Sequence, residues 1–80
     1  MKPSLSDHSA FLAGSYLPGL RFKHNDYVRV VAGTHAGTVG SLISVEDLGS
    51  DPVFLIELDS NKDALVQQSS LVLVDTQPHT

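Results

Sequence analysis

The chain has 80 residues and a formal net charge of −4, with 41% hydrophobic residues, 18% charged residues and no cysteine. A chain of this length forms one small domain with enough apolar material for a core, which disfavours both intrinsic disorder and a large catalytic cleft. The lack of cysteine excludes disulfides, thiolate zinc sites and cysteine nucleophiles. No apolar run approaches the roughly 20 residues that span a bilayer, and no signal-peptide block is present, so we expect a cytoplasmic protein without a membrane segment.

The first twenty residues differ in pattern from the rest of the chain and are interpreted as an N-terminal extension. Ser6 is a candidate N-cap for a short helix from Asp7 to Ala13, because serine caps helices. Gly14 is expected to end this helix, since glycine accepts the conformation found after a helix C-terminus. The alternative is a polar tail that is disordered in isolation.

The apolar periodicity then changes to two, which is typical of β-strands separated by turns. Within residues 27–31, Val28 and Val30 are expected to face the core. Tyr27 and Arg29 are then expected to face solvent.

Residues 33–38 are predicted to form the loop of a hairpin, because Gly33 and Gly37 adopt a positive φ at little cost. The second strand is predicted at residues 39–45. Gly40 lies inside that strand, where glycine normally weakens pairing, so it predicts either a β-bulge or the close approach of another backbone.

Residues 46–52 are acidic and rich in turn-forming residues, which predicts a mobile surface loop. A third strand is predicted at residues 54–58, and Asn61 in the next turn is best suited to a left-handed conformation. A fourth strand is predicted at residues 63–67 and a single tight turn at residues 68–70. The last strand is predicted at residues 71–74, where it closes the sheet against the first.

Five short strands predict an all-β fold, in the form of a small barrel. We place this barrel at residues 21–76, between the extension at residues 1–20 and a C-terminal tail at residues 77–80. No repeat, low-complexity tract or long helix is present in the sequence.

Residues 26–42 resemble the KOW motif, because alternating valines follow Asp26 and the glycines at positions 33, 37 and 40 come next with the spacing of that motif. The motif is shared by a family of large-subunit ribosomal proteins and by transcription elongation and antitermination factors, where it forms the first hairpin of an SH3-like barrel. The resemblance covers about a fifth of the chain. It implies a five-stranded SH3-like barrel of the KOW type and an association with RNA, ribosomes or transcription.

The chain departs from this family at several positions. Asn25 precedes the aspartate where the family usually has glycine, and asparagine can replace glycine in a turn. Nucleic-acid-binding members often carry basic residues between the glycines, whereas this chain has Thr34, His35, Ala36, Thr38 and Val39. The resemblance therefore implies the fold more directly than it implies RNA binding.

Two groups of residues are candidate binding residues. Thr34 and His35 lie in the predicted hairpin loop, and loops on a rigid β scaffold often carry contacts, although the glycines around them are also explained by turn formation alone. Cations alternate with aromatic residues around the first strand, as in surfaces that stack bases and hold phosphates. The binding candidates of this second group are Arg21, Lys23, Tyr27 and Arg29. The alternative, which we favour, places Phe22 in the core with Tyr27 half-exposed.

Charge is unevenly distributed, with a sum of +2 over residues 1–45 and −6 over residues 46–80. An acidic surface of this kind can attract a basic partner protein, or it can simply keep a small domain soluble. The acidic residues of the second half are Glu46, Asp47, Asp51, Glu57, Asp59, Asp63 and Asp75.

The four histidines have no further ligand at a recognised metal-binding spacing, and no local nucleophile motif is present, so we expect neither metal, cofactor nor catalysis. The sequence favours a non-enzymatic module that binds another protein in the bacterial cytoplasm. An edge strand of a partly open barrel could also accept a peptide. The alternative is an RNA-, ribosome- or transcription-associated KOW-type module, and the sequence leaves the oligomeric state open.

Overall fold

The fold was analysed in a computed structural model that describes residues 1–15 and 17–74. It contains one short α-helix, five β-strands and one 3₁₀ turn, so the predicted β-rich fold of five strands is confirmed. The elements are α1 (Leu5–Leu12), β1 (Tyr27–Val30), β2 (Val39–Asp47), β3 (Val53–Leu58), β4 (Asp63–Gln67), η1 (Gln68–Ser70) and β5 (Leu71–Leu73). The end of the predicted barrel at residues 75–76 and the predicted tail at 77–80 lie outside the described residues.

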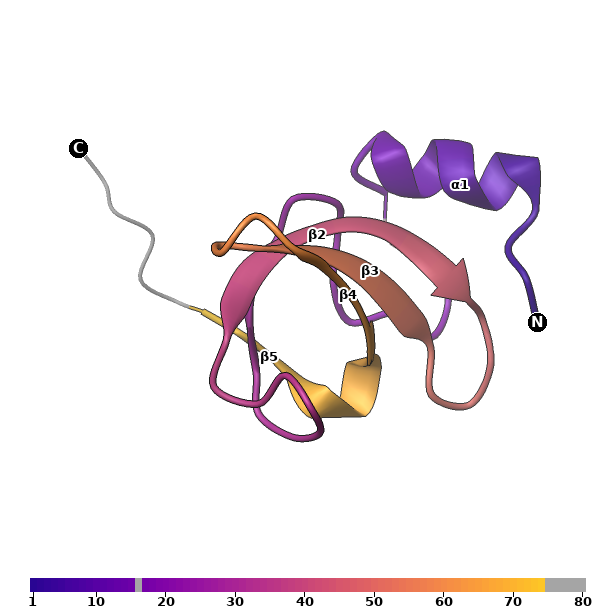
Figure 1. The fold of residues 1–80 in the computed structure, drawn as a ribbon. Coiled ribbons are helices and arrows are strands. Elements are labelled where there is room, and N and C mark those ends of the chain that lie inside the picture. The colour runs from indigo at the N-terminus through magenta and orange to yellow at the C-terminus, as the bar shows by residue number, and fades with distance from the viewer. Residues whose placement is uncertain (16, 75–80) are drawn as a thin grey trace.

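The five strands form a single antiparallel sheet in the order β4-β3-β2-β1-β5. The last strand pairs with the first, as predicted, with Arg29 of β1 opposite Val72 of β5. Figure 1 shows that the sheet is strongly curled and that η1 connects β4 to β5. Within residues 1–15 and 17–74, β4 pairs only with β3 and β5 only with β1, so the sheet is open and these two strands form its edges.

The core lies on the inner side of the curled sheet, because buried positions alternate with exposed or half-buried ones along the strands. Val28 and Val30 are buried and Arg29 is exposed, which confirms the predicted alternation in β1. The strands β2 to β5 contribute the buried residues Leu42, Val45, Phe54, Ile56, Leu58, Ala64, Val66 and Leu71.

The N-terminal segment forms a helix, but its cap differs from the predicted one. Ser4, not Ser6, is the N-cap: its hydroxyl accepts from the Asp7 backbone N–H at 3.1 Å, and the Asp7 carboxylate accepts from the Ser4 N–H at 3.0 Å. This reciprocal pair needs an acidic residue three positions after the cap, and Ser9 at that position after Ser6 cannot provide it. The helix ends as predicted before Gly14, which has a φ of 87°.

Residues of the N-terminal segment belong to the same core as the sheet. The helix lies against β2 (Figure 1). The side chain of Phe11 is completely buried, and its ring centroid lies 6.0 Å from that of Phe54 in β3 and 6.1 Å from that of His24. Leu20 is also buried. The segment predicted as an extension therefore supplies part of the hydrophobic core.

Strand β2 continues to Asp47, two residues beyond its predicted end. The pairing with β3 shifts register between Leu42 and Ser44 and again between Val45 and Asp47, which allows the strand to bend and still pair with the start of β3. The predicted bulge is therefore not at Gly40. Gly40 instead allows the close approach of another backbone, the second explanation predicted for it, because a Cβ at position 40 would lie 2.3 Å from the backbone oxygen of Glu57.

The turns follow the predicted residue types. Asn61 has a φ of 68°, the left-handed conformation expected of it. Asn25, which stands where the family usually has glycine, is also left-handed, with a φ of 71°. The predicted tight turn before the last strand is the 3₁₀ turn η1. In the described part of the chain, no helix is long and apolar enough to cross a membrane.

Candidate functional site

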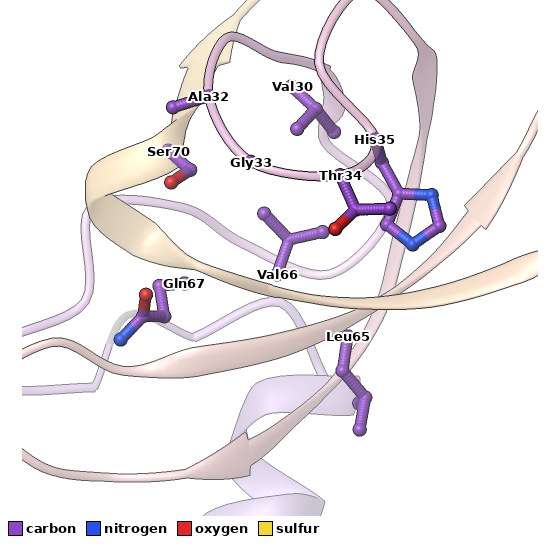
Figure 2. Close-up of a pocket in the computed structure, with 9 residues that line it drawn as sticks. All are labelled: Val30, Ala32, Gly33, Thr34, His35, Leu65, Val66, Gln67 and Ser70. Atoms are coloured by element: carbon purple, nitrogen blue, oxygen red, sulfur yellow. The ribbon is translucent and has the colours of Figure 1, made fainter.

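A cavity of about 270 Å³ lies between the β1–β2 loop and strand β4. One wall is formed by residues 30 and 32–35, and the other by residues 65–67 together with Ser70 of η1. Figure 2 shows Thr34 and His35 on the loop side, with the side chain of Val66 directed toward the loop and that of Leu65 directed away from it. We call this cavity the edge groove.

The groove follows the edge of β4 that β3 does not occupy. Successive residues of a strand point to opposite faces of a sheet, so a cavity that touches Leu65, Val66 and Gln67 in turn must border the edge of the strand as well as its faces. Because β3 pairs with β4 along its other edge, the groove borders the unpaired one. This places backbone polar groups of β4 within reach of a molecule in the groove.

The loop wall is held by its own hydrogen bonds. Gly37 N–H donates to Val30 O at 2.8 Å, and the Thr38 hydroxyl donates to His35 O at 2.6 Å. Gly33 and Gly37 have φ values of 86° and 92°, which residues with a Cβ rarely adopt. The glycines thus shape the loop, and Thr34 and His35 are presented from it at the groove.

Leu65 on the opposite wall has 62% of its surface exposed, although it lies in the middle of a regular strand. Its neighbour across the strand pair, Leu55, is half-buried. Sequence reasoning did not select Leu65. The sequence did contain a signal for it. The alternation of β4 makes Asp63, Leu65 and Gln67 face outward, and Leu65 is the apolar residue among them.

The predicted residues Tyr27 and Arg29 lie on the outer face of β1 and are not among the residues that line the groove. The Tyr27 hydroxyl donates a hydrogen bond to the carboxylate of Asp59. This bond raises the pKa of the Tyr27 phenol, and the negative charge of Asp59 acts in the same direction. Arg29 is exposed and lies opposite Val39 and Val72 in the neighbouring strands.

Arg21 and Lys23 lie in the segment before β1, where hydrogen bonds fix the backbone. Arg21 N–H donates to the side-chain oxygen of Gln68 at 2.8 Å, and the Arg21 guanidinium donates to the Gln68 backbone oxygen at 3.2 Å. Lys23 N–H donates to the carboxylate of Asp26 at 2.8 Å. Gln68 is buried and also donates to Gly19 O, so it ties this segment to η1, a role that sequence reasoning missed.

The rings of Phe22 and His24, which follow these two cations in the chain, turn inward. Phe22 is buried against Phe54, with 5.9 Å between ring centroids, as the favoured alternative predicted. His24 is half-buried, forms a hydrogen bond with Ile43 O at 2.8 Å and contacts the edge of the Phe11 ring. Neither ring is therefore presented on the surface as a platform for stacking bases.

Some of the acidic residues have local partners. The carboxylate of Asp51 accepts from the hydroxyl of Ser69 at 2.6 Å and from its backbone N–H at 2.9 Å. Glu57 and Asp63 are both exposed and lie directly opposite each other in β3 and β4. Among the described residues, neither carboxylate forms a hydrogen bond or an ion pair.

The Asp51–Ser69 contact predicts a pH dependence of stability. Its two hydrogen bonds favour the charged carboxylate and hold the pKa of Asp51 below its ordinary value of 3.8. Because the pKa is lowered in the folded state, the contact stabilises the fold above that value and ceases to do so as pH falls through the lowered pKa. Asp51→Asn is expected to be less stable than the wild type near pH 7, and the difference is expected to shrink at about pH 2.

Urea denaturation of both proteins over this pH range measures the difference. Ser69→Ala removes a donor and is expected to reproduce the same pH dependence while leaving the carboxylate in place. A difference in unfolding free energy that stays constant from about pH 7 to about pH 2 would contradict the assignment.

Among residues 1–15 and 17–74, no group of three or more histidine, aspartate or glutamate side chains is arranged to hold a metal ion. Comparisons of the chain with protein-family models, with curated proteins and with solved structures find no match. The site is therefore interpreted from its geometry.

Proposed function

We propose that this chain is a non-catalytic protein-binding module of the cytoplasm, built on an SH3-like barrel, and that the edge groove is its contact surface. The observation that carries the proposal is the combination of the groove, the unpaired β4 edge and the exposed Leu65 in one place. Unpaired backbone groups of an edge strand can pair with another chain, and the groove and Leu65 add apolar surface beside them.

The groove suits a segment of a protein better than a small molecule. Its volume of about 270 Å³ lies close to the lower bound of the range of about 300–1,000 Å³ that is usual for small-molecule sites, so the preference rests on the strand edge that it borders. Thr34 and His35, which were candidates from the sequence, form the wall opposite β4. The hydrogen-bonded loop presents them without a large cost in conformational entropy, which favours binding.

The distribution of cations supports this proposal over the RNA-associated alternative. Arg21 is engaged with Gln68 and its guanidinium lies 5.6 Å from the Phe22 ring centroid, while Arg29 lies on the outer face of β1. RNA binding needs several cations that reach phosphates together with exposed rings that stack on bases. Phe22 and His24 are packed inward, so that Tyr27, half-buried and hydrogen-bonded to Asp59, is the one aromatic ring of residues 21–29 on the outer face.

Affinity purification from a lysate of the source cells tests the proposal. The immobilised wild type is compared with Thr34→Trp, which fills the groove, and with Ala36→Trp, which places the same ring on the same loop outside the groove lining. We expect a protein partner whose recovery, quantified by mass spectrometry, falls about tenfold with Thr34→Trp, as for a loss of about 1.4 kcal/mol of binding free energy. The Ala36→Trp variant should recover it as the wild type does.

Equal recovery by all three proteins would exclude the groove as the contact surface. Recovery that is abolished by ribonuclease, together with retention of mixed RNA that weakens steeply with salt, would favour the RNA-associated alternative instead.

A further inference from the structure

Strand β4 offers a regular edge that no other strand among residues 1–15 and 17–74 pairs with. Its five residues pair with β3 in an uninterrupted register from Asp63 to Gln67, without the bulges that interrupt the pairing of β2 with β3. Half of the backbone N–H and C=O groups of such a strand point away from its neighbour. These groups form a template on which a further strand can pair.

This edge lacks the features that usually prevent strand addition. Natural edge strands are protected by charged side chains, especially lysine, by proline, by bulges or by a covering element. Residues 63–67 contain no lysine, proline or bulge, their one charged residue is Asp63, and their central outward-facing residue is Leu65, with 62% of its surface exposed. The edge groove runs along this strand, so space for an added segment exists beside it.

The charge near the end of β4 indicates the chemistry of the partner. Glu57 and Asp63 are opposite each other on the exposed face, and like charges at directly opposed positions destabilise a strand pair. Asp59 in the adjoining turn adds a third negative charge, and Lys62 is the one cation within residues 57–63. A cationic side chain on an added strand opposite Asp63 would offset this repulsion.

We propose that the partner binds as an extended segment that pairs with the free edge of β4, with an apolar side chain beside Leu65 and a lysine or arginine two residues away, beside Asp63. The two-residue spacing places both side chains on the same face of the added strand. This inference rests on the proposed function and specifies the partner of the same groove.

A second copy of the chain is a poorer occupant of this edge. Antiparallel pairing of two β4 strands about Leu65 would place Glu57 and Asp63 of both copies on one continuous sheet face. Each copy carries a net charge of −4, so the pairing would join two acidic surfaces. A basic segment from another protein complements the same surface.

A designed peptide tests the inference directly. The blocked peptide Thr-Lys-Thr-Val-Thr-Lys-Thr has high strand propensity and places a lysine beside Asp63 in either strand direction when its valine lies beside Leu65. Titration into the ¹⁵N-labelled full chain, followed by NMR, is expected to shift the amide signals of residues 63–67 and 33–35. Amide protons of β4 that face outward should become protected from hydrogen exchange.

Two control peptides separate the parts of the proposal. Replacing both lysines with glutamate is expected to weaken binding about tenfold because glutamate would oppose Asp63. Methylating alternate backbone nitrogens along one edge removes the donors needed for strand pairing and is expected to abolish binding.

Protein variants test the named contacts. Asp63→Lys is expected to reverse the preference, so that the glutamate peptide binds better than the lysine peptide. Leu65→Thr should weaken binding of the lysine peptide several-fold. Val72→Thr, an equivalent change at a side chain that is 44% exposed on the other edge strand, should leave binding unchanged.

Equal binding of the lysine and glutamate peptides, or unchanged binding after N-methylation, would overturn the inference. So would β4 amide signals that shift with protein concentration when no peptide is present, because they would show that β4 pairs with a second copy. If a protein partner is recovered in a manner that depends on Thr34 but the lysine peptide shifts no β4 amide, the protein-binding function stands and strand addition is excluded. If no partner is recovered but the peptide binds at β4, strand addition at this edge stands and the proposed protein-binding function is not supported.

Discussion

Phe11→Ala is expected to lower the free energy of unfolding by about 3–5 kcal/mol, the usual cost of removing a buried phenylalanine. Phe11 belongs to the N-terminal helix, but its side chain is completely buried and contacts Phe54 in the sheet. An 80-residue domain is expected to have a total stability of roughly 4–12 kcal/mol, so this single change would remove a large part of it. Urea denaturation followed by circular dichroism measures the effect.

Leu12→Ala is the matched control for this prediction. Leu12 follows Phe11 in the same helix, but 53% of its surface is exposed. Its replacement is expected to change stability by less than about 1 kcal/mol, because little apolar area returns to water and alanine favours helix. Similar small effects for both variants would show that α1 contributes little to the core, as expected of a separate extension.

Gly40→Ala is expected to destabilise the protein by about 3 kcal/mol. The added Cβ would lie 2.3 Å from the backbone oxygen of Glu57 and 2.8 Å from the Cα of Leu58. Both atoms belong to the backbone of β3, so relief of the clash requires the strands to separate and not merely a change of rotamer. Chemical denaturation of the purified variant measures the loss.

Gly49→Ala provides the comparison, because a Cβ at position 49 has no atom within 4 Å and the residue does not have a positive φ. Its stability is expected to stay within about 1 kcal/mol of the wild type, with a slight gain if the unfolded chain loses entropy. Equal stability of the Gly40→Ala and Gly49→Ala variants would contradict the close approach of β2 and β3 at Gly40.

Both predictions concern the scaffold that positions the edge groove. Strand β4, which forms one wall, pairs with β3 and buries Ala64 and Val66. The loop wall follows β1, which is paired on both sides. A variant that disturbs the β2–β3 pairing is therefore expected to alter the β4 wall, so stability must be checked before any binding defect is assigned to the groove.

Much of the local structure followed from the sequence. Alternation placed Val28 and Val30 in the core, because neighbouring side chains of a strand point to opposite faces. The positions of the left-handed Asn61 and of the tight turn before the last strand follow from residue types whose conformations are decided locally. A helix was predicted in the right region, but its start and cap were wrong: it begins at Leu5 and not at Asp7, since Ser4 and Ser6 are both acceptable caps and only Ser4 has Asp7 at the reciprocal position.

The sequence by itself determined a β-rich chain of five strands, the faces of the first strand and two of the residues at the groove, Thr34 and His35. Only the tertiary structure decided that Phe11 and Leu20 enter the core and that the loop meets β4 at Leu65. Periodicity and turn chemistry act between residues that are near in the chain, whereas the groove depends on the curl of the whole sheet, which brings together segments that are far apart in sequence.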